Sequence, residues 1–81
     1  MKGLKLTEIE SHGFKLNFKR FMLTEHDVLP KDSMAPHLIN CIGNYNWYAG
    51  EVIQVFTNRR KAENAFGNLA RNYVVTDIDF I

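Results

Sequence analysis

The chain has one cysteine, two prolines and almost no net charge. A single thiol, Cys41, cannot form an intrachain disulfide, which is typical of proteins from a reducing compartment. Ten basic and nine acidic residues leave a net charge of +1. This balance argues against a protein that attracts nucleic acid through its overall charge.

Long apolar runs are absent as well. No stretch approaches the roughly 20 apolar residues that a membrane-spanning helix needs. The start, residues 1–5, is not followed by the apolar stretch of a signal peptide. These absences predict a soluble, cytoplasmic protein that does not contact membranes.

Sequence motifs of enzymes and metal sites are also missing. The chain has no glycine-rich phosphate loop, no nucleophile elbow and no CxxC or HExxH motif. His37 and Cys41 are four residues apart and form at most half of a zinc site. Asp77 and Asp79 point the same way on an expected strand, but they fit a solvated strand edge better than a catalytic pair. We therefore expect a non-enzymatic protein without a metal or a cofactor.

What the chain does contain is typical of one small globular domain over residues 1–81. Hydrophobic residues make up 46% of the sequence and aromatic residues 12%, which is enough for a packed core. A domain of this length buries only roughly 60–65% of the surface of its unfolded chain. We therefore expect modest stability.

The C-terminal part of the chain predicts a strand, a helix and a second strand, over residues 51–56, 57–72 and 73–81. Four apolar side chains share one face of the helix at 100° per residue: Ala62, Phe66, Leu69 and Tyr73. Thr57 or Asn58 can cap the start of this helix, and Asn72 can end it in a left-handed conformation.

The N-terminal part predicts an antiparallel hairpin, with a strand at residues 4–9, a turn at residues 11–13 and a second strand at residues 14–23. Three side chains of the second strand alternate toward one face, which we assign to the core: Phe14, Leu16 and Phe18. Phe21 and Leu23 fall on the other face, so we expect a bulge near Lys19 and Arg20 to switch the faces.

The middle of the chain is the least regular part. Residues 24–36 contain both prolines, which disfavour helix at the preceding residue. Two alternatives remain for the next segment, a short helix over residues 33–40 or a third strand over residues 38–42. Residues 43–46 predict a turn, followed by a strand to Phe56 with a bulge at Gly50.

These elements predict the α+β class, with a four- to five-stranded antiparallel or mixed sheet and one helix, about residues 58–72, packed on one face. The other face is either solvated or used for association. This leaves room for a homodimer through that face or edge to edge. Asp77 and Asp79 should face solvent and discourage pairing at their edge of the sheet.

The first candidate site is an aromatic and asparagine-rich segment beside the expected turn: Asn44, Tyr45, Asn46, Trp47 and Tyr48. Rigid aromatic side chains supply contact area at low entropy cost, and asparagine adapts its hydrogen bonds to a partner. We interpret this segment as a protein-binding surface. The alternative is that Trp47 closes the core and the tyrosines surround it.

The second candidate site is a basic surface that would bind an anion or nucleic acid: Arg59, Arg60, Lys61, Arg71, Lys15 and Lys19. The first three lie at the N-terminal end of the helix, where a bound phosphate would relieve their repulsion by the helix dipole. Lys15 and Lys19 alternate with aromatic residues, as in proteins that bind single-stranded nucleic acid. The alternative is a solvated basic face beside an ordinary amphipathic strand.

We favour a small interaction protein that binds another protein and inhibits or modulates it. Binding of nucleic acid or a nucleotide by the basic helix face is the alternative. The small size, the eight asparagines and the lack of a catalytic motif resemble phage accessory proteins that inhibit host factors. This resemblance is one of composition, and it implies a host factor as the partner and action in the host cytoplasm.

Overall fold

Five strands and one helix make up the described part of the chain, which covers residues 1–12, 17–31, 40–42 and 44–81 of the computed structural model. In chain order they are β1 (Lys2–His12), β2 (Asn17–Pro30), β3 (Asn40–Ile42), β4 (Tyr45–Phe56), α1 (Arg59–Ala70) and β5 (Val75–Asp79). The α+β class expected from the sequence is confirmed.

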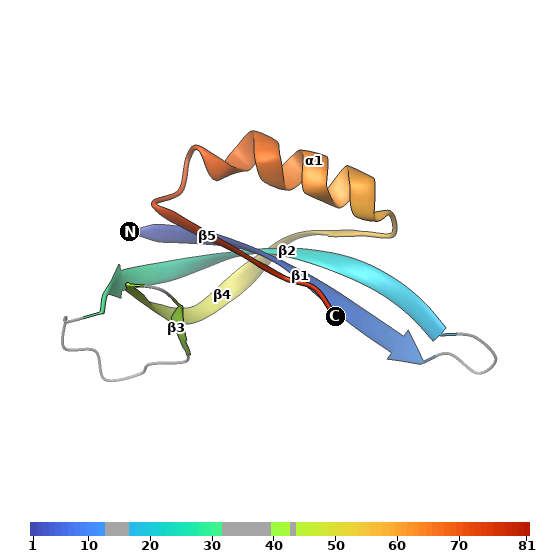
Figure 1. Cartoon of the computed structure of the whole chain (residues 1–81), viewed down its shortest axis with the longest axis horizontal. Helices are drawn as coiled ribbons and strands as arrows, with labels where there is room; N and C mark the ends of the chain where they lie inside the picture. Colours follow the sequence, from blue (N-terminus) through green and yellow to red (C-terminus); the bar gives the residue numbers. More distant parts are fainter. Residues whose placement is uncertain (13–16, 32–39, 43) are drawn as a thin grey trace.

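The strands form one mixed sheet in the order β3-β4-β2-β1-β5. β1 pairs antiparallel with β2, β2 with β4, and β4 with β3, whereas β1 and β5 are parallel. Because β4 and β5 lie on opposite sides of the β1–β2 hairpin, α1 carries the chain across one face of the sheet (Figure 1). This confirms the predicted sheet with one helix on one face.

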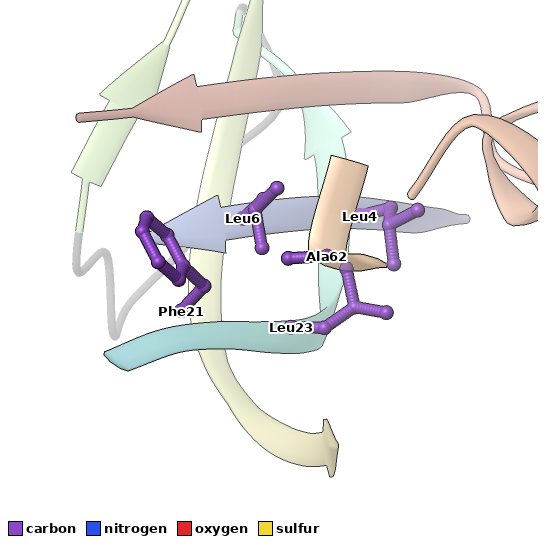
Figure 2. Close-up of a cluster of buried hydrophobic side chains, with 5 residues drawn as sticks. All are labelled: Leu4, Leu6, Phe21, Leu23 and Ala62. Atoms are coloured by element: carbon purple, nitrogen blue, oxygen red, sulfur yellow. The ribbon is translucent and has the colours of Figure 1, made fainter. Parts of the chain in front are cut away.

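The core lies between α1 and the two central strands. Figure 2 shows its five buried side chains, which come from β1, β2 and α1: Leu4, Leu6, Phe21, Leu23 and Ala62. Burial of a leucine or phenylalanine side chain contributes about 1.5–3 kcal/mol, so this cluster supplies much of the stability. Phe66, Leu69 and Tyr73 pack against the cluster, which confirms the predicted apolar face of the helix.

The helix begins as the sequence predicts and ends differently. The side chain of Asn58 accepts a hydrogen bond from the Lys61 backbone N–H at 3.1 Å, as an N-cap does. At the other end the capping residue is Arg71, whose φ of −64° is right-handed. The N–H of Asn72 donates a hydrogen bond to the carbonyl oxygen of Leu69, three residues earlier, so the helix is followed by a tighter turn of the 3₁₀ type. The C-cap is therefore Arg71 and not Asn72, the residue that the sequence predicted for it.

The β1–β2 hairpin corrects the predicted faces of β2. Its pairing runs without a shift from Lys2 opposite Asp27 to His12 opposite Asn17, so the expected bulge at residues 19–20 is absent. Residues 11 and 12, which we expected in a turn, are paired as part of β1, and residue 13 lies outside the described part. Phe21 is buried under α1, whereas Phe18 is 40% exposed on the other face. The core role predicted for Phe18 is wrong, because the position of the helix decides which face is inside. Phe14, Lys15 and Leu16 lie outside the described residues.

β2 also extends through much of the segment that we expected to be irregular. It pairs with β4 as far as Pro30, which is opposite Tyr45, because the neighbouring strand supplies partners for its backbone. Of the two alternatives for the next segment, the structure shows the third strand, over residues 40–42. Residues 33–39 lie outside the described part. β4 already begins at Tyr45, so the expected turn is shorter than predicted. The pairing of β4 with β2 shifts just before Gly50, in agreement with the predicted bulge.

The face of the sheet away from α1 carries mixed side chains. On this face Lys5 forms an ion pair with Asp77 at 3.6 Å, and both side chains are about three-quarters buried or more. Asp77 is thus less solvated than expected, whereas Asp79 is exposed as predicted. The described residues include no helix that is long and apolar enough to cross a membrane.

Candidate interaction surfaces

The aromatic and asparagine-rich segment of residues 44–48 is split between interior and surface. Trp47 is only 2% exposed and Asn46 only 6%. Asn44 is exposed, and Tyr45 is half-buried. Trp47 therefore belongs to the interior, as in the alternative that the sequence left open, and only part of the predicted surface is accessible to a partner.

Trp47, on β4, is held by residues from two other strands, β2 and β1. Its side chain lies beside Val28, its neighbour across the β2–β4 pair, and His26 meets the indole edge to face at 5.4 Å between ring centres. On β1, Gly3 leaves room for the ring, because a methyl group there would come within 2.8 Å of it. These contacts form a second, smaller core on the face away from α1. Gly3 was not among the predicted site residues. The signal that could have found it is its place inside a strand, where a glycine often marks the close approach of another group.

His26 is fixed by hydrogen bonds on both ring nitrogens. Nδ1 lies 2.7 Å from the carbonyl oxygen of Tyr48, which can only accept, so Nδ1 carries a proton. In the neutral ring, Nε2 then accepts from the Thr24 hydroxyl at 2.7 Å. Because Thr24 is buried, this pair of bonds sets the orientation of the ring against Trp47.

Two buried donors belong to neighbouring residues of β4, Trp47 and Tyr48. Among the described residues, neither Nε1 of Trp47 nor the hydroxyl of Tyr48 has a hydrogen-bond partner. An unpaired buried donor costs about 1–3 kcal/mol. The second core is therefore less stable than its close packing suggests.

An open hollow of about 620 Å³ lies at the end of the sheet where β2 stops and β4 begins. Four residues line it in the described part of the chain: Pro30, Lys31, Asn44 and Tyr45. Its two sides are tied together, because the Lys31 N–H donates to the Asn44 carbonyl oxygen at 2.8 Å. Tyr45 and Trp47 are two residues apart on one strand, so they share the face away from α1. The hollow is thus lined by a half-buried tyrosine, whose neighbour on the same face, Trp47, is buried and fixed.

The basic helix face is less open than its sequence suggests. Arg59 donates to the Glu63 carboxylate at 2.6 Å and lies over the Phe80 ring at 4.5 Å, so its charge is engaged within the protein. Asn58 already occupies the backbone N–H of Lys61. Arg60, Lys61 and Arg71 are exposed and have no ion pair among the described residues, whereas Arg59 is exposed but paired with Glu63. Lys19 is exposed on β2.

The outer edge of β4 is a surface that sequence reasoning missed. β3 pairs only with residues 45–47, and in the described part of the chain no strand lies along the rest of that edge (Figure 1). Three aliphatic side chains of this free stretch are 43–55% exposed: Val52, Ile53 and Val55. The sequence predicted a strand over residues 51–56, and only the strand order shows that these side chains lie at an edge.

The chain was compared with known proteins in three ways. No protein-family model, no curated protein and no solved structure matches it. Within the described ranges, no group of three or more His, Cys, Asp or Glu side chains could hold a metal ion. Any function therefore has to be argued from the surfaces themselves.

Proposed function

We propose that this chain is a small, non-enzymatic, cytoplasmic protein that binds another protein at the hollow beside Tyr45 and inhibits or modulates it. The observation that carries the proposal is the placement of Tyr45 at the rim of an open hollow. Pockets that receive a partner side chain are typical centres of protein interfaces.

The surroundings of Tyr45 support this role. Trp47 lies next to it on the same face and is fixed by Gly3, Val28 and His26. A rigid support reduces the entropy that Tyr45 loses when a partner binds. Lys31 adds one exposed positive charge at the rim, which favours a partner that carries a carboxylate there.

The test is a comparison of Tyr45→Ala with the wild-type chain. Partners are first captured on the immobilised protein from an extract of its native source and identified by mass spectrometry. The affinity of the purified partner is then measured by calorimetry. We expect Tyr45→Ala to weaken binding roughly tenfold or more, as loss of a central interface aromatic does.

The control for this test is Asn68→Ala, an exposed position on α1, across the sheet from the face that carries Tyr45, which should bind like the wild type. Trp47 is unsuitable for the test, since its burial means that truncation would damage the fold. Unchanged affinity in a folded Tyr45→Ala variant would remove the hollow as the binding site.

Nucleic-acid binding by the exposed cations of the helix segment is the second candidate. Arg60, Lys61 and Arg71 have no ion-pair partner among the described residues. Phosphate contacts by these side chains would make binding fall steeply with salt concentration. A gel-shift series with single- and double-stranded probes at low salt tests this candidate, and the absence of any shift there would exclude it.

A further inference from the structure

The two edges of the sheet differ in their protection against another strand. At the β5 edge, the exposed Asp79 and the ion-paired Asp77 place charge along the strand. At the β4 edge, residues 52–56 carry no charge, and Val52, Ile53 and Val55 are exposed. Charged side chains are the usual means by which an edge strand avoids pairing, so the β4 edge is open to it.

The charges at the two ends of this free edge are of opposite sign. Glu51 lies at its N-terminal side, directly opposite Glu25 on β2. Like charges in that position destabilise a sheet. Glu25 accepts a hydrogen bond from the Tyr73 hydroxyl at 3.2 Å, whereas Glu51 has no ion pair in the described part of the chain. At the other end of the strand, Arg60 and Lys61 are exposed at the start of α1.

An antiparallel arrangement of two such strands would satisfy these charges. A two-fold axis at Gln54 places residue 51 of one copy opposite residue 57 of the other, and an axis at Val55 places it opposite residue 59. Either register brings Glu51 close to the start of α1 of the second copy. Glu51 lies on the same face of the sheet as α1, because its partner Glu25 contacts Tyr73 there. The strand is therefore complementary to itself in charge as well as in apolar character.

From this complementarity we propose that the chain forms a homodimer in which the β4 strands of two copies pair antiparallel about a two-fold axis at residues 54–55. The two sheets become one continuous sheet, and the exposed aliphatic side chains of both copies meet across the new pair. In β4, Ile53 is an extra residue, because Val52 and Gln54 pair with the consecutive residues Thr24 and Leu23 of β2. A bulge of this kind bends the strand, so the pairing between the two copies is confined to the C-terminal part of β4. This inference is independent of the hollow at Tyr45.

The proposal is tested by sedimentation velocity and light scattering on the full chain between about 5 and 500 µM, the range of a moderate homodimer. The wild type should be dimeric in the upper part of this range. Ile53→Lys should weaken the dimer roughly tenfold or more, because the new charge would be buried without a partner. Val74→Lys is the matched control: Val74 is 51% exposed, against 43% for Ile53, but lies outside β4, and this variant should dimerise like the wild type.

A second measurement uses charge reversal. Glu51→Lys should weaken the dimer, and combination with Arg60→Glu and Lys61→Glu should restore it. In a Cys41→Ser background and with dissolved oxygen as the oxidant, Val55→Cys should form a disulfide-linked dimer, whereas Val74→Cys should not.

A wild type that stays monomeric throughout the concentration range would overturn the proposal. So would a dimer that tolerates Ile53→Lys but is dissociated by Val74→Lys. Neither result bears on the Tyr45 hollow, whose test uses a different variant and a different partner.

Discussion

Gly3 lies against the indole of Trp47, so close that a methyl group on residue 3 would come within 2.8 Å of Cη2 and Cζ3. The same methyl group would approach Cγ1 of Val28 at 2.9 Å. Carbon atoms do not sit this close without displacement, so the strand needs glycine at this position to bury the tryptophan. The contact links the first residues of the chain to the segment that carries Tyr45.

Gly3→Ala is therefore expected to destabilise the protein. Either Trp47 or Val28 has to move, and overpacking of this kind lowers the free energy of unfolding by about 1–3 kcal/mol. Urea denaturation measures this loss. The fluorescence of Trp47, the one tryptophan of the chain, should report greater solvent exposure. Unchanged stability and unchanged emission would mean that the indole is held in some other way.

Gly67→Ala is the matched substitution, and it should raise the stability of the protein instead of lowering it. Gly67 lies inside α1, and a Cβ atom there would meet nothing within 4 Å. Alanine restricts the unfolded chain and favours helix, so the free energy of unfolding should rise by about 0.5–1 kcal/mol. Thermal denaturation followed by circular dichroism gives the result, and a lower melting temperature would contradict the prediction.

Tyr48→Phe should stabilise the protein or leave it unchanged. The Tyr48 hydroxyl is buried and has no partner in the described part of the chain, so its removal relieves a desolvation cost of about 1 kcal/mol or more. Tyr73→Phe is the control, because that hydroxyl donates to Glu25 and its loss should cost about 1 kcal/mol. Equilibrium unfolding of both variants checks the pair. A loss of stability in Tyr48→Phe would mean that this hydroxyl has a hydrogen-bond partner.

Tyr73 also predicts how stability changes at alkaline pH. Burial, followed by the hydrogen bond to Glu25, raises the pKa of Tyr73 above its ordinary value of 10.0. The unfolded chain therefore releases this proton at a lower pH than the folded protein does. The contribution of Tyr73 to stability is complete below about pH 10 and is lost as the pH rises through the pKa of the folded state.

Melting temperatures between about pH 9 and about pH 11 test this dependence. The wild type should lose more stability over this range than Tyr73→Phe, which cannot ionise at this position. Parallel curves for the two proteins would show that Tyr73 titrates alike in the folded and unfolded states.

The helix illustrates what local pattern can predict. Ala62, Phe66 and Leu69 recur at the helical period, and this spacing alone places them on one face. The structure packs that face on the core, and it begins the helix after Asn58, whose side chain caps it. Both features depend on residues within a few positions of one another, so they are visible in sequence.

β2 illustrates the opposite case. It carries Phe18 on one face and Phe21 on the other, and alternation alone cannot say which face is inside. α1 lies on the side of Phe21, and Phe18 is left exposed. The first candidate site shows the same dependence on distant residues. Trp47 is buried because it packs against Gly3 and Val28, and both are distant from it in the chain.

By itself, then, the sequence determined the kinds of element and their approximate positions, since helical and strand periods are properties of neighbouring residues. The strand order, the buried face of each strand and the free edge at Val52–Val55 were decided only by the tertiary structure. The reason is physical: whether an apolar side chain is core or surface depends on what packs over it, and those atoms come from elsewhere in the chain.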